Sequence, residues 1–460
     1  MIEEIVKRVV SKETTAVEEV TRALERAKEK EEYRAFVCLT EKRAIEEAEK
    51  LDERIKKGEK VGRLAGVVYA LEDVFLDYGA PMTAASKMLE NFNAPLQATV
   101  VKKLEAEGAI CLGRVNPSLL VCDEKKESIT KPTLDPYDKT RTISGTAAAV
   151  ALGIVPFALG CDTGGSVRQS ASHGGLVGFK PTYGAISRFG VATLGSSTDS
   201  VGCVATISED VEVVMSAISG IDGRDSTTLP DFFVIEKELP KKLRVGLVRE
   251  LMTDDVDSEI RGAVEKYADK LKKAGHDVAE VSLPAVEYGL MAHQVIVSAE
   301  ASSNLGRYDG VRYGFCDDKV KTVSDLYVLN RTGGLTPEEK RRTMVGNYMV
   351  LKETYEKFFV KAGKVRTVII DELDEAFGKF DVLLGPVVLN SAPKLGSGIG
   401  DPMEVYKGDF ATVVANLAGL PAVSVPAGET KDGLPIGVQL IGARKADMAV
   451  LALAREGEKA

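Results

Sequence analysis

The chain opens with the hydrophobic pattern of amphipathic helices. Four apolar residues recur at the spacing of one helix face: Val17, Val20, Leu24 and Ala27. Thr15 and Glu18 have the spacing of a capping box, in which each side chain accepts a hydrogen bond from the other residue's backbone N–H group. Residues 2–57 are therefore predicted to be helical, and we expect residues 1–60 to form a helical N-terminal segment packed on the core.

From Gly66 the pattern changes to short apolar runs separated by glycine-rich turns and amphipathic helices. The runs that predict strands cover residues 66–71, 109–114, 155–160, 243–248, 380–386, 422–426 and 434–442. The segments that predict helices include residues 100–108, 257–274 and 446–458. This alternation predicts an α/β fold, a mostly parallel mixed sheet covered by helices on both faces. No repeat or linker marks a domain boundary, so we expect residues 61–460 to form one core, with residues 222–242 as a long surface excursion.

Composition and charge exclude several classes of partner. The net charge is −9, from 60 Lys and Arg residues against 69 Asp and Glu residues, whereas a protein that holds a phosphate backbone needs clustered cations. Direct nucleic-acid binding is therefore not expected. The first residues are acidic where a signal peptide is basic, and no apolar stretch approaches the roughly 20 residues of a membrane span. We expect a soluble protein that stays in the cytoplasm.

The cysteines argue against a metal site. Six of them are spread along the chain without a CxxC pair: Cys38, Cys111, Cys122, Cys161, Cys203 and Cys316. This spacing fits reduced thiols in the cytoplasm better than a disulfide framework or a zinc site. No metal or other cofactor is expected.

The densest run of special residues is GCDTGGSVRQ, residues 160–169, directly after an apolar run. Its glycines let several backbone N–H groups lie close together, as the binding of an oxyanion requires, and leave the Ser166 hydroxyl unobstructed. From this run alone, a nucleophile beside its own oxyanion hole and a tight turn with a capping serine are equally good interpretations. No GxSxG elbow surrounds Ser166, and the chain has three histidines: His173, His276 and His293. His173, seven residues beyond Ser166, is better interpreted as structural.

Residues 153–191 resemble the characteristic motif of the amidase signature family, which is a DTGGSIR-like run followed by GLKPTYG. The corresponding segments here read DTGGSVR and GFKPTYG. Further segments resemble the A subunits of glutamyl-tRNA(Gln) and aspartyl-tRNA(Asn) amidotransferases within that family: residues 83–92, 299–314, 338–348, 364–369 and 416–428. The resemblance spans nearly the entire chain and implies the amidase-signature fold.

The resemblance also implies a reaction. In that family a lysine deprotonates a bridging serine held in a cis peptide, this serine relays to the nucleophilic serine, and backbone amides hold the oxyanion. Ser166 would then be the nucleophile, with Thr163, Gly164 and Gly165 as the oxyanion loop. The A subunit releases ammonia from glutamine and passes it to a B subunit that amidates glutamate on tRNA, while a small C subunit clasps A. Amidotransferase-type B and C subunits are thus the implied partners, and glutamine or another small amide or amino acid is the implied ligand.

The chain departs from the family pattern at the activating residues. Glu72 stands at the lysine position, and Thr142 stands at the bridging-serine position, in a run where three of the family's four glycines are replaced. A cis bond before a non-proline residue costs about 3–4 kcal/mol, so we expect an ordinary trans peptide before Thr142. The loop that lines the family's pocket is replaced as well, by VCDEKK at residues 121–126.

These replacements predict that the standard reaction is impaired. A glutamate at position 72 can in principle accept a hydroxyl proton, and Asp73 beside Glu72 can raise its pKa. However, a carboxylate within several ångströms of a developing oxyanion repels it by on the order of a few kcal/mol at an effective dielectric of about 20. The base, the relay and the pocket loop are all altered at one site.

Ligand recognition rests on the resemblance alone. It implies that an arginine, matched by Arg341 or Arg342, binds the glutamine carboxylate and that Asp409 binds the amino group. By itself the EEKRRT segment is typical of a solvated helix face, and KGDFAT is typical of a helix cap. With the surrounding match, these residues are candidate ligand contacts.

Three functional interpretations follow. The first is a pseudoenzyme-like relative of the A subunit, with a role in ligand binding or assembly. The alternative is a functional glutamine amidohydrolase subunit, or an amidase on another amide, in which Glu72 activates Ser166 through water. A connected hydrogen-bond chain of Glu72, Thr142 and Ser166 would favour that alternative. The third is a structural subunit whose cleft is filled by side chains: Arg141, Ile143 and residues 123–126.

Overall fold

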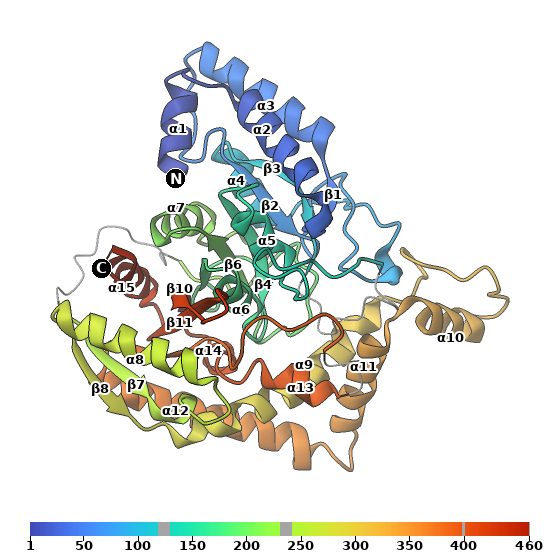
Figure 1. Ribbon diagram of the computed structural model, residues 1–460. Helices are drawn as coiled ribbons and strands as arrows, with labels where there is room; N and C mark the ends of the chain where they lie inside the picture. Colours follow the sequence, from blue (N-terminus) through green and yellow to red (C-terminus); the bar gives the residue numbers. More distant parts are fainter. Residues whose placement is uncertain (118–128, 231–241, 398–400, 460) are drawn as a thin grey trace.

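The computed structural model describes residues 1–117, 129–230, 242–397 and 401–459. Its strands form one 11-stranded sheet, in the order β1-β3-β2-β4-β6-β5-β10-β11-β9-β7-β8 (Figure 1). The strands are β1 (Phe36–Leu39), β2 (Val68–Glu72), β3 (Ile110–Val115), β4 (Phe157–Asp162), β5 (Val177–Lys180), β6 (Ser200–Ala205), β7 (Arg244–Val248), β8 (Asp277–Val281), β9 (Val382–Pro386), β10 (Ala422–Glu429) and β11 (Pro435–Gly442). Every apolar run that predicted a strand lies in this sheet, whereas β1, β5, β6 and β8 were not predicted.

The sheet is mixed, as expected, but the expectation that parallel pairs predominate is wrong. Parallel pairs occur on either side of the middle, where β2 pairs with β3 and β4, and β7 pairs with β8 and β9. Every other adjacent pair in the described ranges is antiparallel. One cause is the β10–β11 hairpin, whose short turn at residues 430–434 leaves no room for a parallel crossover. The other is the unpredicted pair β5 and β6, which lies antiparallel between β4 and β10.

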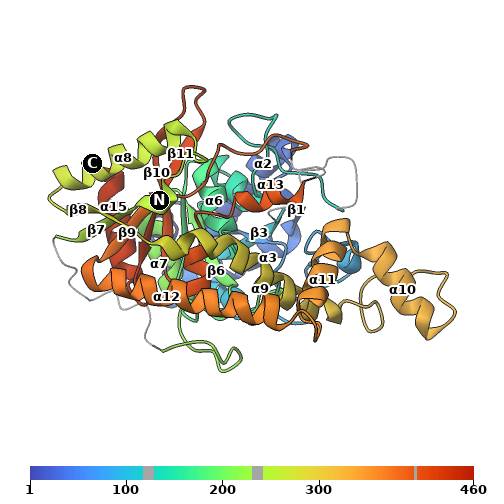
Figure 2. The same ribbon diagram turned by 90° about the horizontal axis from the view of Figure 1, so that it is seen from below.

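The α-helices alternate with these strands along the chain. They are α1 (Ile2–Val10), α2 (Ala16–Glu29), α3 (Glu41–Lys56), α4 (Thr99–Ala106), α5 (Gly145–Ala151), α6 (Ser166–His173), α7 (Ser208–Ile218), α8 (Ser258–Lys273), α9 (Gly289–Asn304), α10 (Val323–Gly334), α11 (Pro337–Met349), α12 (Lys361–Lys379), α13 (Pro402–Lys407), α14 (Val413–Ala418) and α15 (Asp447–Lys459). Figures 1 and 2 show them surrounding the sheet, with α10 at the outer edge in both views.

Helices cover both faces of the sheet, as expected. Along β2, Tyr69 and Leu71 belong to the apolar cluster formed with α4, α7, α8 and α15. Val68 and Ala70 belong to the opposite cluster, formed with α2, α3, α5 and α6. Because successive strand residues point to opposite faces, this alternation assigns each helix set to its own face. Along β9, Leu383 packs in the same alternation against α9, α12 and α14, which therefore extend the second layer.

The N-terminal segment contains a strand that its helical pattern concealed. The predicted capping box is present at the start of α2: the Glu18 N–H donates to the Thr15 hydroxyl at 3.1 Å, and the Thr15 N–H donates to the Glu18 carboxylate at 3.0 Å. Residues 36–39, however, form β1, which pairs with the edge of β3, so the prediction of helix throughout residues 2–57 is wrong there. The four-residue run FVCL is too short to show a strand periodicity.

Some expectations concern features that the model describes only in part. Of the predicted excursion at residues 222–242, the first part is an irregular loop and residues 231–241 lie outside the described ranges. None of the helices in the described ranges is long and apolar enough to cross a membrane. The five cysteines among the described residues are free thiols, and Cys122 lies outside them. Within the same ranges, no group of three or more His, Cys, Asp or Glu side chains is arranged to hold a metal ion.

Candidate active site

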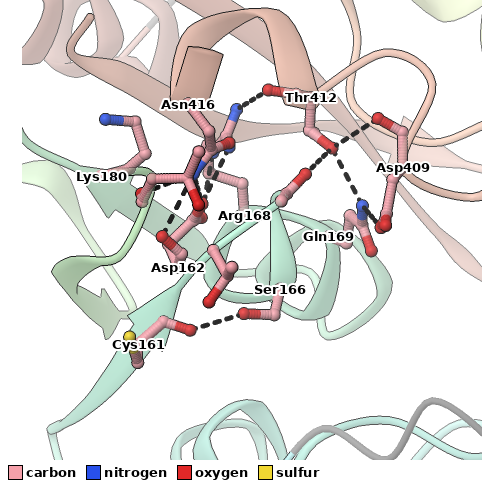
Figure 3. Close-up of polar contacts among 12 residues, drawn as sticks. Cys161, Asp162, Ser166, Arg168, Gln169, Lys180, Asp409, Thr412 and Asn416 are labelled. Carbon is pink, nitrogen blue, oxygen red and sulfur yellow. Dashed lines mark hydrogen bonds and ion pairs between the residues drawn. The ribbon is translucent and has the colours of Figure 1, made fainter. Parts of the chain in front are cut away.

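The loop that carries Ser166 joins the end of β4 to the start of α6. Ser166 is the first residue of that helix, and its hydroxyl donates a hydrogen bond to the Cys161 carbonyl at 2.7 Å (Figure 3). Gly165 precedes it with a φ of 133°, in a region that L residues rarely adopt. A Cβ atom at Gly165 would also lie 2.1 Å from the Thr412 hydroxyl oxygen. Both constraints explain why the loop needs glycine immediately before its serine.

Two side chains from distant helices fix the carbonyl groups of this loop. His293, on α9, donates from Nε2 to the Thr163 carbonyl at 3.0 Å, and Thr412 donates from its hydroxyl to the Gly164 carbonyl at 2.6 Å. Because C=O and the following N–H point in opposite directions in a trans peptide, these bonds turn the Gly164 and Gly165 N–H groups to the other side of the loop. No acceptor for the N–H groups of residues 163–166 occurs within the described part of the chain. Such N–H groups suit a developing oxyanion.

His293 acts here as a neutral donor. A carbonyl oxygen accepts hydrogen bonds only, so the proton of the neutral ring lies on Nε2. Burial lowers the pKa of His293 to about 4, which keeps the ring uncharged at neutral pH. His173, by contrast, is the last residue of α6. Its Nε2 atom lies 3.2 Å from the Asn390 carbonyl oxygen, in agreement with a structural role.

A buried ion pair anchors the loop to the rest of the fold. The Arg168 guanidinium donates two hydrogen bonds to Asp162, at 2.9 and 3.0 Å, and both side chains are fully buried. It also donates to Asn416 at 2.6 Å, to Gln439 at 2.6 Å and to the Thr412 carbonyl at 3.1 Å. Burial acts to raise the pKa of Asp162, but the Arg168 charge and hydrogen bonds hold it below its usual value. The carboxylate is therefore ionised and fully paired.

The predicted relay positions do not form a chain with Ser166. Glu72, at the end of β2, accepts a hydrogen bond from the Cys161 N–H at 2.7 Å. The Thr142 hydroxyl donates to the Thr133 carbonyl at 2.7 Å. No cis peptide occurs among the described residues, so the bond before Thr142 is trans. In the described part of the chain, the three side chains bond to the backbone and not directly to one another.

Lys180 is the buried amine nearest in sequence to this loop, within the GFKPTYG segment. Burial lowers its pKa to about 7, with a further contribution from the Arg168 charge. Its ammonium donates to the Pro181 carbonyl at 2.7 Å, and Figure 3 shows the amine pointing away from Ser166. The amine that the Glu72 position lacks is therefore not supplied by Lys180.

The candidate ligand-binding residues lie beside the oxyanion loop. A Cβ atom at Gly164 would lie 3.4 Å from a carboxylate oxygen of Asp409 and 3.0 Å from the His293 ring. Gln169 donates to the other carboxylate oxygen of Asp409 at 3.0 Å (Figure 3). Burial raises the pKa of Asp409 to about 6, whereas Gln169 and the charge of Arg342 act to lower it. The Asp409 carboxylate thus faces the site and does not merely cap the turn that contains it.

The two candidate arginines are distinguished by their burial. Arg342 is 6% exposed and donates to Glu338 at 2.8 Å, and its charge acts on both Asp409 and His293. Arg341 has a side chain that is 34% exposed and donates to Glu338 and, at 2.7 Å, to the Tyr406 hydroxyl. Arg342 is thus the buried member of the pair, close enough to Asp409 and His293 for its charge to act on both, whereas the Arg341 side chain is partly exposed.

The three sets of residues that were expected to alter or fill the cleft have different outcomes. Arg141 donates to the Ala392 carbonyl at 2.5 Å and to Asp138 at 3.1 Å, which holds its side chain away from Ser166. Residues 121–126, which include the charged residues 123–126, lie outside the described ranges. Ile143 is buried in the apolar cluster on the second face of the sheet.

Several residues of the site carried no decisive sequence signal. Thr412, Asn416 and Gln169 are common polar residues far from Ser166 in the chain or inside its helix. Asp199 accepts a hydrogen bond from the Thr163 hydroxyl at 2.6 Å, and burial raises its pKa to about 6. His293 was one of three histidines in the chain, but its sequence position gave no reason to place it at the loop.

Comparison with known proteins agrees with this geometry. The amidase family model matches residues 18–451. The chain belongs to the amidase family. It is 42% identical over 443 residues to the glutamyl-tRNA(Gln) amidotransferase A subunit of Fusobacterium nucleatum, covering 94% of this chain and 91% of the relative. It is 40% identical over 453 residues to the corresponding A subunit of Trichodesmium erythraeum, covering 96% and 93%.

Solved amidase structures share the fold. The glutamyl-tRNA(Gln) amidotransferase A subunit of Thermotoga maritima has a TM-score of 0.73 and 37% identity, covering 87% of this chain and 84% of that one. A bacterial aryl acylamidase of the amidase signature family has a TM-score of 0.85 and 25% identity, covering 99% and 95%. This amidase-family chain is therefore A-subunit-like over nearly its whole length.

Proposed function

We propose that this amidase-family chain binds glutamine or a similar small amide as an A-type amidotransferase subunit, without the standard Ser-Ser-Lys hydrolysis. The observation that carries the proposal is the Ser166 hydroxyl, which donates to the Cys161 carbonyl. A carbonyl oxygen is too weak a base to take that proton. Thr142 is directed to another carbonyl, and Glu72 offers a negative charge where the family mechanism uses a lysine.

The binding half of the proposal rests on the groups around the loop. The Gly164 and Gly165 N–H groups suit the amide oxygen of a ligand. Arg342 offers a guanidinium for an α-carboxylate, and Asp409 offers a carboxylate for an α-ammonium group. These groups come from α11 and from the turn before α14, so they do not depend on Glu72 or Thr142 for their positions.

A rewired hydrolase is the second candidate, favoured by one contact. Glu72 accepts from the N–H of Cys161, and Ser166 donates to the carbonyl of the same residue. The Glu72 carboxylate and the Ser166 hydroxyl therefore bond to the main chain of the same residue. A glutamate base acting through water would need the Ser166 hydroxyl to leave the Cys161 carbonyl.

The decisive experiment measures ammonia release and glutamine binding on the same preparation. Purified chain, alone and with candidate B and C subunits, is assayed with glutamine and asparagine beside Ser166→Ala. We expect no release that depends on Ser166, but saturable glutamine binding by calorimetry. Arg342→Gln should abolish that binding, whereas the matched variant Arg341→Gln should retain it. Ammonia release at ordinary enzymatic rates that Ser166→Ala abolishes would refute the proposal, and its loss in Glu72→Gln would assign the base.

We further propose that B- and C-type subunits contact the outer corner formed by α10 and α11. Large apolar side chains are exposed there, including Val323 at 75%, Met344 at 72% and Val328 at 58%. Both helices thus carry large exposed apolar side chains, of the kind that protein interfaces cover. Val323→Glu with Met344→Glu should weaken copurification of candidate B and C subunits, and unchanged complex formation would place their interface elsewhere. The expected cytoplasmic location stays a prediction.

A further inference from the structure

A cavity of about 250 Å³ is lined by residues of α12, of α14 and of the segment after β11, and its lining includes neither Arg342 nor Asp409. Its lining includes two arginines and four other residues: Arg366, Arg444, Tyr183, Ser197, Ile370 and Leu417. Arg366 comes from α12, and Arg444 follows β11. Neither residue belongs to the site described above.

Among the described residues, the acceptors of both guanidinium groups are neutral. Arg366 donates to the Leu417 carbonyl at 2.6 Å, to the Ser197 hydroxyl at 2.8 Å and to the Ser197 carbonyl at 3.1 Å. Arg444 donates to the Ala418 carbonyl at 3.1 Å. Within the ranges that the structure covers, neither group forms an ion pair with a carboxylate; the nearby Glu300 instead accepts from the Ser197 N–H. Most donors of Arg444 remain available to a ligand.

The cavity therefore concentrates positive charge in a partly desolvated place. Burial lowers the pKa of Arg366, and the neighbouring Arg444 charge lowers it further, while Glu300 and Tyr183 act against this shift. Two like charges close together repel each other more strongly where water is excluded. An anion between them would relieve this repulsion and would receive charge-assisted hydrogen bonds from both guanidinium forks.

We propose that this cavity binds a small oxyanion, either a carboxylate or a phosphate. The Tyr183 ring, Ile370 and Leu417 supply an apolar wall for a short carbon chain, which suits an aliphatic carboxylate or a phosphate ester. The competing explanation is that both arginines only cap the carbonyl groups at the end of α14, as cationic side chains commonly do. That role uses few of their donors and leaves the cavity without a function.

The cavity walls are continuous with the oxyanion loop. Ser197 lies two residues before Asp199, which accepts the Thr163 hydroxyl bond. Leu417 lies on α14, directly after Asn416, which donates to Asp162 at 2.8 Å. An occupant would therefore hold the two segments that support the loop from behind.

Calorimetric titration of the purified full chain tests this site without glutamine. The probes are sodium phosphate and sodium butyrate, each against sodium chloride at equal ionic strength. We expect saturable binding of at least one probe, weakened at least about tenfold in Arg444→Gln, since a hydrogen bond to a charged group is worth about 1.5–3 kcal/mol. Arg54→Gln, which removes the same charge from a partly exposed arginine on α3, should bind as the parent does.

The outcomes separate the two explanations. Binding of phosphate alone would identify a phosphate ester as the occupant, and binding of butyrate alone would identify an aliphatic carboxylate. Failure of both probes to saturate, or equal affinity of Arg444→Gln and the parent, would overturn the proposal and leave the arginines as helix caps. Arg444 is exposed and makes a single hydrogen bond in the described structure, so circular dichroism of the variant should match that of the parent.

Discussion

Removing the Arg168 guanidinium should be among the most damaging single changes to this fold. Arg168→Met leaves the Asp162 carboxylate fully buried and takes away both of its charge-assisted bonds, at 2.9 and 3.0 Å. Breaking a buried pair by removing one partner costs about 3–5 kcal/mol, because the remaining charge is uncompensated. Asn416 still donates to Asp162 at 2.8 Å, so the lower part of that range is the better expectation.

Urea unfolding followed by circular dichroism measures this cost, with the slope checked to confirm that only stability has changed. The matched control is Arg63→Met, in which the lost ion pair to Glu107 spans 3.3 Å and the arginine is 49% exposed; it should cost about 0–1 kcal/mol. Adding Asp162→Asn to Arg168→Met should recover part of the loss, because no unpaired carboxylate then remains. Equal midpoints for Arg168→Met and Arg63→Met, or no recovery in the double variant, would refute the reasoning.

The contribution of the Asp162–Arg168 ion pair to stability depends on pH in a definite direction. The folded-state pKa of Asp162 lies below its ordinary value, so the pair contributes fully above the unfolded pKa of about 4 and loses its contribution as pH falls through the folded pKa. In Arg168→Met, burial still raises the pKa of Asp162, and the Lys180 charge and the Asn416 hydrogen bond are left to lower it, so the pKa should rise. The stability difference between parent and variant should therefore shrink as pH is lowered toward 4, and a constant difference would contradict this account.

Three further predictions concern the site and the helix layer. Glutamine affinity should fall as pH drops through about 6, because Asp409 then protonates and loses its attraction for the ammonium group. Glutaramate, which lacks that group, should show no such fall, and calorimetry at several pH values checks both ligands. Thr412→Val should weaken glutamine binding by roughly threefold to tenfold through loss of one hydrogen bond to the oxyanion loop, and unchanged affinity would count against that role. Gly346→Ala would place a Cβ atom 1.9 Å from the Ser298 carbonyl oxygen between α11 and α9, so urea unfolding should show the free energy of unfolding reduced by roughly 1–3 kcal/mol. The control Gly363→Ala, whose Cβ atom would meet open space, should be neutral or stabilising.

Much of the sheet was predictable because its strands are buried apolar runs. Strands β5 and β8 were missed for physical reasons: β5 is only four residues long, and β8 (DVAEV) is largely exposed and interrupted by charges. The sheet direction was also misjudged, since local patterns give no information about which distant strands become neighbours. Loop position and strand periodicity are local properties, whereas strand order is not.

The candidate site, like the sheet, has parts that local sequence patterns reveal and parts that they do not. The run around Ser166 is recognisable through its glycines, whose need is local: the φ of Gly165 and its closeness to Thr412. The groups that orient the loop come from other parts of the chain, such as His293 on α9, and polar residues at such separations leave no periodic signal. The choice between Arg341 and Arg342 stayed open in the sequence because adjacent helix residues differ only in the direction they face, which burial reveals.

The arrangement of supports is what allows the proposed function to separate binding from turnover. The oxyanion loop is held by Arg168 from its own helix, by Thr412 before α14 and by His293 on α9. Glu72 accepts a hydrogen bond from the Cys161 N–H, upstream of the N–H groups of Gly164 and Gly165. On the proposed function, exchange of the base and the relay would remove proton transfer while the groups proposed to orient an amide keep their own supports.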